Sequence, residues 1–137
     1  HPQHRRQRQM CIRDRAVPMA GVVIVTTPQQ VSLQDARRGL AMFRQLGIPV
    51  LGVAENMSAF IPPDRPEQRY ALFGSGGGAT LAADYDVPLL AQIPMEMPVQ
   101  EGGDSGRPIV ISRPDSASAV EFQGLAERVL QQVTATA

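Results

Sequence analysis

The stretch Gly21–Thr26, which reads GVVIVT, decides the fold of this chain. Its four central residues are all apolar and β-branched, with no polar residue alternating between them. A strand with one solvated face alternates apolar and polar residues, whereas an unbroken apolar run is typical of a strand buried on both faces. Such strands belong to parallel sheets that helices cover on both sides. The stretch therefore predicts an α/β fold with a parallel sheet.

An amphipathic helix and a second strand follow this first strand. Ser32 with Asp35 three residues later resembles the capping box of a helix N-terminus. Leu33–Leu46 then carries apolar residues at spacings of three and four, and Gly47 predicts the end of that helix. Val50–Ala54 is a second apolar run. The three elements therefore predict a strand–helix–strand unit of a parallel sheet.

The rest of the chain continues the alternation of strands and helices. We expect a short helix at Ala79–Tyr85 and a third strand at Leu89–Ile93. A helical turn and loop at Met95–Gly103 and a short extended segment at Pro108–Ile111 should follow. The chain should end in a helix at Ala117–Val133, whose residues toward the core are Val120, Leu125, Val129 and Val133. This alternation predicts a three-layer α/β sandwich. Three strands are fewer than the five or more of a doubly wound sheet, so the chain is predicted to be the back half of one.

The composition is that of one small folded domain. The chain has 137 residues, of which 43% are hydrophobic, and this is enough for one packed core. Its single cysteine, Cys11, excludes an internal disulfide framework and favours a reducing cytoplasm. No segment approaches the roughly 18 apolar residues of a membrane span, and no apolar stretch follows the basic start as in a secretory signal. We therefore predict a cytoplasmic protein without membrane contact.

Charge divides the chain into two parts. Residues 1–15 contain five of the 13 basic residues but only one of the 13 acidic residues, which leaves a mildly acidic body. An acidic body argues against a nucleic-acid partner, which needs a basic face. Residues 1–15 show neither a helical nor a strand period, and we predict that they are a non-native or disordered basic arm. The folded domain would then cover residues 16–137.

The chain contains no lysine, because all 13 of its Lys and Arg residues are arginine. A Walker A loop needs a lysine that reaches the β- and γ-phosphates of a nucleotide. The segment Gly74–Thr80 (GSGGGAT) is rich in glycine, but a proline-rich loop precedes it and Ala79 stands where the lysine would be. We interpret it as an entry loop with a helix N-terminus. The chain by itself is therefore predicted not to hydrolyse ATP.

Five motifs follow one another along the chain. They are GVVIVTTPQQVSLQDARRGLAMF (Gly21–Phe43), IPVLGVAENMS (Ile48–Ser58), FGSGGGATLAADYDVPLLAQIPME (Phe73–Glu96), EGGDSGRPIV (Glu101–Val110) and PDSASA (Pro114–Ala119). In this order they closely resemble the Mrp family of iron–sulfur cluster carriers, which belongs with the MinD/ParA-like P-loop ATPases. The resemblance implies a three-layer P-loop NTPase-type parallel sheet, of which this chain is the C-terminal portion.

The resemblance also implies a function for the full-length protein. Members of this family bind and hydrolyse ATP with Mg²⁺, dimerise around the nucleotide, and hold a [4Fe–4S] cluster or pass it to iron–sulfur apo-proteins. The family's phosphate loop, switch segments and magnesium-binding acid lie upstream of Val17. We therefore expect a homodimeric carrier whose catalytic part is outside this chain, and we assign no catalytic or metal-binding residue here.

Three residues are candidates for nucleotide binding. Asn56 comes at the end of the second strand, and ligands of doubly wound sheets bind at the carboxyl ends of the strands. A carboxamide there both donates to and accepts from an adenine edge, and the resemblance implies that contact, although spacing alone favours a turn-capping asparagine. Pro94 and Glu96 follow the third strand, where the resemblance implies the other wall of the adenine pocket. A proline-initiated turn with a surface glutamate is the alternative.

The loop Met57–Phe73 departs from the family pattern. Many members carry a Cys-x-x-Cys pair here for the cluster, and iron in such clusters is held by thiolates. This loop reads MSAFIPPDRPEQRYALF and has no cysteine. We therefore predict that a cluster binds weakly or not at all through this loop. The apolar, stiff segment 60–63 (Phe-Ile-Pro-Pro) is interpreted as a docking edge for a partner instead.

Two other functions remain open from the sequence. A MinD/ParA-like positioning ATPase would end in a basic amphipathic helix that binds a membrane, whereas residues 129–135 here are neutral. A non-catalytic assembly scaffold would need neither the lysine nor the cysteines. We favour the iron–sulfur carrier that binds and hydrolyses ATP when full length.

Overall fold

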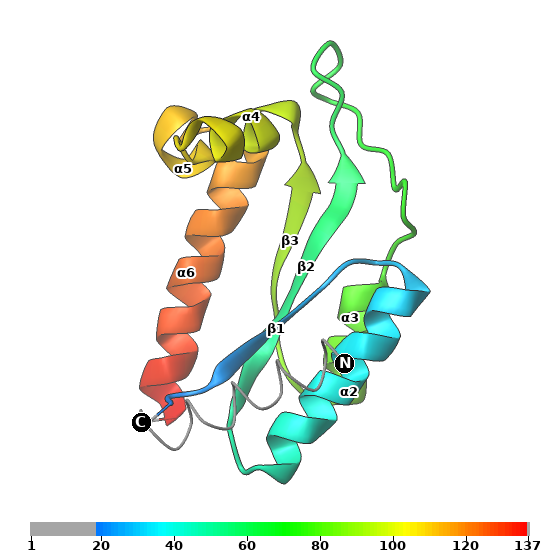
Figure 1. Ribbon diagram of the computed structural model, residues 1–137, viewed down its shortest axis with the longest axis vertical. Coiled ribbons are helices and arrows are strands. Elements are labelled where there is room, and N and C mark those ends of the chain that lie inside the picture. The colour runs from blue at the N-terminus through cyan, green and yellow to red at the C-terminus, as the bar shows by residue number, and fades with distance from the viewer. Residues whose placement is uncertain (1–18, 137) are drawn as a thin grey trace.

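A parallel sheet forms the centre of the computed structural model, which describes residues 19–136 (Figure 1). Its three strands lie side by side in sequence order, and these are β1 (Val22–Thr26), β2 (Val50–Phe60) and β3 (Leu89–Met95). Ile24 of β1 pairs with Val53 of β2, and Ala54 of β2 pairs with Ala91 of β3. The predicted α/β class, the three strands and their parallel direction are confirmed. The prediction for residues 1–15 lies outside the described residues.

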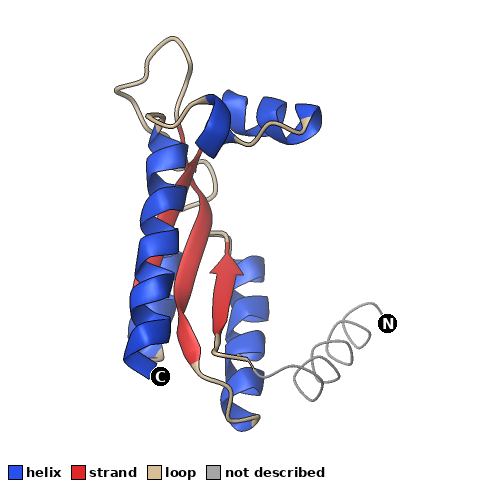
Figure 2. Cartoon of the chain, turned by 90° about the vertical axis from the view of Figure 1, so that its left-hand side faces the viewer, coloured by secondary structure: helices blue, strands red, loops and turns tan. Residues whose placement is uncertain are grey.

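Helices cover both faces of this sheet. On one face lie α2 (Gln30–Gln45) and α3 (Gly77–Asp84), and on the other lies α6 (Ala117–Thr136). Figure 2 shows the sheet edge-on between the two helical layers. The short helices α4 (Met97–Ser105) and α5 (Ile109–Ser112) lie beyond the end of β3, on the side of α6. No helix within residues 19–136 combines the length and apolarity that crossing a membrane requires.

The main core lies between the sheet, α2 and α3. Leu40 of α2, Val53 of β2 and Leu81 of α3 have no exposed surface. The stripe that predicted α2 supplies its buried residues, which are Leu33, Ala36, Leu40 and Phe43. These four residues recur every three or four positions, so one face of the helix removes them all from water.

The start of α2 differs from the prediction. The helix begins at Gln30, two residues before the expected cap, and its N-cap residue Gln29 makes no side-chain capping bond. The Gln29 carbonyl accepts the first helical hydrogen bond from the Leu33 amide at 3.0 Å. Ser32 lies inside the first turn, where its hydroxyl accepts a hydrogen bond of 2.7 Å from Thr27. The predicted capping box is wrong because the Ser32 hydroxyl is engaged by the preceding loop.

The segment predicted to be extended near Pro108 is helical instead. Pro108 is the N-cap of α5, and its carbonyl accepts hydrogen bonds from the amides of Ile111 and Ser112 at 2.9 and 3.0 Å. The helix brings Ile109 to 4% exposure against α6, so burial of one side chain outweighs the β-propensity of this short run.

The register of α6 also differs from the prediction. Ser118 and Ala119 have no exposed surface, whereas Val120 is 54% exposed. Leu125 and Val129 are half-buried, as is Val133. Val120 is the wrong member of the predicted set, because small residues at the start of α6 allow the helix to approach β3 closely.

Candidate functional site

Asn56 lies where the regular pairing of β2 with β3 ends. It pairs with Ile93, after which the register shifts and pairing resumes only at Phe60. Met57, between them, has a φ of 55°, a left-handed conformation that is uncommon for a residue with a side chain. Asn56 was expected to end the strand. The strand continues to Phe60, and Asn56 instead precedes an irregularity within it.

The Asn56 side chain is held by its own backbone. Its Oδ1 accepts a hydrogen bond of 2.9 Å from the Met57 amide, and the residue is half-buried. A carboxamide carries two N–H donors besides this acceptor oxygen. No hydrogen bond from the Asn56 Nδ2 is found within residues 19–136. The arrangement therefore orients an amide group that has donors available for a ligand.

A cavity of about 550 Å³ opens between β1 and α2. Its lining combines apolar side chains of β1 and α2 with polar groups from these two elements, the loop between them and β2. The polar lining residues are Thr26, Thr27, Ser32, Asp35, Arg38 and Asn56. The cavity follows the side of β1 that has no neighbouring strand within residues 19–136, so a strand added there would fill part of it.

Pro94 was expected after the third strand but lies inside β3, and Glu96 follows β3 as the N-cap residue of α4. The Pro94 carbonyl accepts a hydrogen bond of 3.1 Å from the Ser118 hydroxyl, and Glu96 Oε1 accepts one of 2.7 Å from the Ser118 amide. Both residues therefore fix the start of α6. Glu96 also lines a separate polar cavity of about 600 Å³ together with Arg113 and Asp115. The structure does not bring Asn56 and Glu96 into one cavity.

The glycine-rich segment Gly74–Thr80 forms a hydrogen bond to a buried carboxylate. The amide of Gly78, in the first turn of α3, donates a hydrogen bond of 2.7 Å to Oε2 of Glu55. Glu55 is 1% exposed and precedes Asn56 in β2. Sequence reasoning missed this contact. The available signal was an isolated acidic residue within the apolar run of the second strand.

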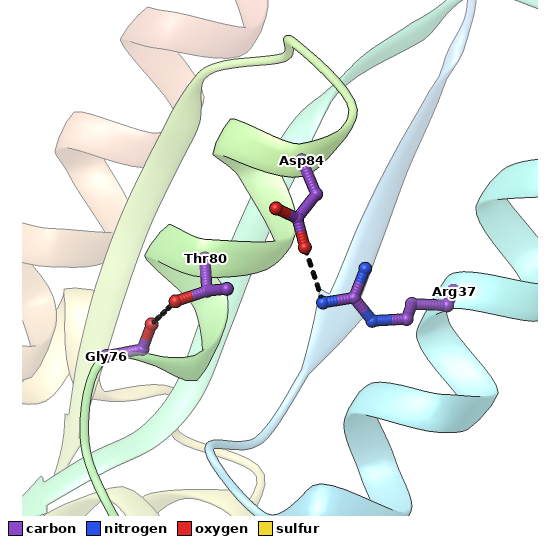
Figure 3. A network of polar contacts seen from close by, with 4 residues as sticks. All are labelled: Arg37, Gly76, Thr80 and Asp84. Carbon is purple, nitrogen blue, oxygen red and sulfur yellow. Dashed lines mark hydrogen bonds and ion pairs between the residues drawn. The ribbon is translucent and has the colours of Figure 1, made fainter.

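An ion pair joins α3 to α2, and a side-chain hydrogen bond lies at the start of α3 (Figure 3). Arg37 of α2 forms an ion pair of 2.7 Å with Asp84, and Thr80 Oγ1 donates to the Gly76 carbonyl at 3.0 Å. The hydrogen bond from Arg37 to Asp84 raises the pKa of the guanidinium above its ordinary value. The guanidinium also lies 6.0 Å from the Tyr85 ring centre, within the range of a cation–π contact.

The donor groups present do not fit a metal cluster. Within residues 19–136 no three His, Cys, Asp or Glu side chains come together as metal ligands. The loop Met57–Phe73 has no cysteine, and carboxylates are hard ligands that suit Mg²⁺ or Ca²⁺ better than cluster iron. The predicted docking edge at residues 60–63 is only partly accessible, because Ile61 is only 6% exposed. Tyr70 and Leu72 are the more exposed apolar side chains of this loop, at 46% and 60%.

The fold is that of the MinD-type P-loop NTPases. MinD of Pyrococcus horikoshii, solved with Mg-ADP, superposes with a TM-score of 0.60 at 29% identity, over 84% of this chain and 43% of that one. MinD of Pyrococcus furiosus gives 0.60 at 27% identity, over 80% and 41%. A nucleotide-binding protein of Archaeoglobus fulgidus in complex with ADP gives 0.59 at 31% identity, over 75% and 40%.

Sequence comparison places the chain more narrowly. The ParA family, described as NUBPL iron-transfer P-loop NTPase, matches residues 7–130, and the chain belongs to this family. The iron–sulfur cluster carrier protein of Synechocystis is 57% identical over 122 residues, which are 89% of this chain and 35% of that protein. The carrier of Escherichia coli K12 is 42% identical over 117 residues, covering 85% and 31%.

A plant relative extends the same pattern. The iron–sulfur protein required for NADH dehydrogenase in Arabidopsis mitochondria is 42% identical over 113 residues, covering 82% of this chain and 36% of that protein. The chain thus spans about a third of the curated relatives it matches. The matched range begins at residue 7 and so includes part of the segment 1–15. The resemblance to iron–sulfur carriers noted in the sequence is confirmed.

Proposed function

We propose that this chain is the C-terminal part of an ATP-binding iron–sulfur cluster carrier and that it supplies the wall of the nucleotide site that faces the adenine. The observation that carries this proposal is the oriented carboxamide of Asn56 at the carboxyl edge of the sheet. Its amide donors suit the ring nitrogens of adenine, which accept hydrogen bonds. Membership in the iron-transfer family and the likeness to a MinD solved with Mg-ADP support it.

The two ends of the nucleotide make different demands on the chain. The adenine end fits the amide donors of Asn56, whereas Pro94 and Glu96 accept hydrogen bonds from Ser118. The phosphate end needs a lysine and a magnesium-holding acid, and the chain has no lysine. Bound Mg²⁺ would supply charge neutralisation at the phosphates, held by residues outside this chain. The chain itself orients the base and contributes no step of phosphoryl transfer.

The outer side of β1 supports the proposal that the phosphate-binding residues lie outside this chain. Among the described strands β1 has a neighbour only on the side of β2, and Val25 on β1 is 64% exposed. A strand of the full-length protein that paired with β1 would cover this apolar surface and extend the sheet. The phosphate-binding residues would then come from that added part of the sheet.

The proposed location, oligomeric state and cargo of the full-length protein are based on its family. We place the full-length protein in the cytoplasm as a homodimer that passes a [4Fe–4S] cluster to iron–sulfur apo-proteins. The cluster is cargo here, and its cysteine ligands would come from outside the loop Met57–Phe73. A non-catalytic assembly scaffold is the second candidate, because the chain has neither a lysine nor a cysteine near this loop. A positioning ATPase is disfavoured by the match to the iron-transfer family.

Titration of ATP into the full-length protein tests this proposal. Asn56→Ala removes the amide donors, and we expect its dissociation constant to rise about three- to tenfold, the effect of one lost hydrogen bond. Gln92→Ala is the matched control, since it removes an exposed carboxamide from β3 and should leave the affinity unchanged. Equal affinities of the wild type and Asn56→Ala would contradict the assignment, and a wild type that binds no ATP would favour the scaffold.

A further inference from the structure

Glu55 is a buried acid in the middle of the sheet. It belongs to the central strand β2 and is 1% exposed, so its carboxylate has lost almost all contact with water. An ionised carboxylate is rarely buried unless another group compensates its charge. No ion pair found within residues 19–136 includes Glu55. The compensating group must therefore be something other than a basic side chain.

The N-terminus of α3 provides this compensation. The Gly78 amide donates to Glu55 Oε2 at 2.7 Å, a distance typical of charge-assisted hydrogen bonds. The first amides of a helix have no partner within the helix, and the helix dipole favours negative charge at this end. One buried contact thus satisfies both an unpaired amide and a buried charge.

The glycines of this segment fit the carboxylate closely. A Cβ atom at Gly78 would lie 2.8 Å from Glu55 Oε2 and 2.9 Å from the Glu55 Cβ, which is too close for any side chain. Gly76, the N-cap of α3, has a φ of 77°, a left-handed conformation that glycine adopts without steric cost. The glycines therefore allow the close contact between α3 and Glu55, and the carboxylate of Glu55 occupies the N-terminus of α3.

We propose that Glu55 is a positioning residue that locks the glycine-rich segment onto β2 and so fixes the backbone that presents Asn56. The two residues are adjacent, and the irregular backbone at Met57 begins directly after them. Without the lock, the end of the loop at residues 61–76 would separate from β2 next to the adenine contact. The part that concerns Asn56 rests on the proposed nucleotide site.

Amide hydrogen exchange, measured on the full-length protein without nucleotide, tests the contact between Glu55 and Gly78 itself. In Glu55→Ala the protection of the Gly78 amide should fall at least about tenfold, because its acceptor among residues 19–136 is gone. Glu55→Gln keeps a carbonyl oxygen in place and should lose less. Glu67→Gln, a change at an exposed acid, should leave Gly78 unchanged.

The conservative variant decides the outcome if Glu55→Ala does not fold. If Glu55→Ala folds, unchanged protection of Gly78 in that variant would overturn the proposal. If it does not fold, protection of Gly78 in Glu55→Gln equal to that of the wild type would overturn it. Gly78→Ala approaches the contact from the other side and should increase exchange of the neighbouring α3 amides. Gly103→Ala is its control, since Gly103 is also helical and has nothing near its Cβ.

Nucleotide affinity separates the lock from the site. In the full-length protein, Glu55→Gln should weaken ATP binding several-fold and raise exchange at Gly78. Asn56→Ala should weaken ATP binding while the protection of Gly78 stays unchanged. If Glu55→Gln speeds exchange at Gly78 but leaves the ATP affinity unchanged, the role of Glu55 in positioning Asn56 is contradicted and the contact between Glu55 and Gly78 stands. If the wild type binds no ATP, the proposed function is refuted and that contact still stands.

Discussion

Single residues in this chain take on roles that their types alone do not assign. Glu55 and Asn56 are consecutive, yet one is buried against a helix N-terminus and the other is half-buried beside a cavity. Successive side chains of a strand point to opposite faces of the sheet, so neighbours in the sequence meet different surroundings. The polar pair at the end of the second apolar run therefore serves both the packing and the candidate site.

Gly52 shows how closely the strands and their connections pack. A Cβ atom there would lie 2.6 Å from the Pro88 carbonyl oxygen and 2.6 Å from Leu90. We expect Gly52→Ala to lower the free energy of unfolding by about 1–3 kcal/mol, because the backbone contact cannot move aside cheaply. Chemical denaturation measures the change. Gly103→Ala should be neutral or slightly stabilising, and equal stability of the two variants would contradict the packing described here.

Asn56 was proposed as a site residue from the sequence, whereas Glu55 was not. That proposal rests on the rule that ligands bind at the carboxyl ends of parallel strands, although β2 continues past Asn56 to Phe60. The role of Glu55 depends on a contact with Gly78, 23 residues away, and no local pattern encodes the approach of two distant segments. Glu96 was predictable as a residue after a strand, but its hydrogen bond to Ser118 depends on where α6 begins.

At the scale of elements, α6 is fixed at its start by the end of β3. The amide of Ser118 donates to Glu96, and its hydroxyl donates to the Pro94 carbonyl at 3.1 Å. Both bonds join residues 22 or 24 positions apart. They tie the helix on one face of the sheet to the strand that it covers.

Ser118→Ala tests this attachment. The change leaves the buried Pro94 carbonyl without its hydroxyl donor, and a buried polar group without a partner costs about 1–3 kcal/mol of stability. Urea denaturation followed by circular dichroism measures the loss. Ser112→Ala, at an exposed serine of α5, should change stability by less than about 0.5 kcal/mol, and a similar small effect at Ser118 would refute the attachment.

The elements themselves were largely predictable, because apolar periodicity carries most of their signal. The stripe of Leu33, Leu40 and Phe43 predicted α2, and the unbroken apolar runs predicted the strands. The failures are local. Pro108 starts a helix because Ile109 finds a buried position against α6, and Ser32 does not cap because Thr27 engages its hydroxyl. Both outcomes depend on tertiary contacts that outweigh local propensity.

At the scale of the whole molecule, the chain forms part of a parallel sheet and belongs to the iron-transfer P-loop NTPase family. It spans about a third of relatives named as iron–sulfur cluster carriers, and it contains no lysine for a phosphate loop. The sequence motifs predicted the family, but composition and periodicity alone could not, since they specify only an α/β domain.

The loop Met57–Phe73 gives a prediction about the cargo. After anaerobic reconstitution of the full-length protein, replacing this loop by Gly/Ser residues should leave the absorbance of the cluster unchanged, because the loop has no thiolate. Replacing cysteines elsewhere in the full-length protein should abolish it. Loss of the cluster on loop replacement, with no effect of the cysteine changes, would show that this prediction is wrong.

The central claim is that this chain forms the adenine-facing wall of a nucleotide site in a longer carrier. A crystal structure of the full-length protein with Mg-ADP tests it most directly. The account predicts that the adenine lies at the carboxyl edge of the sheet, with a ring nitrogen about 3 Å from the Asn56 amide nitrogen. An adenine bound elsewhere, with Asn56 in contact only with its own backbone, would contradict it.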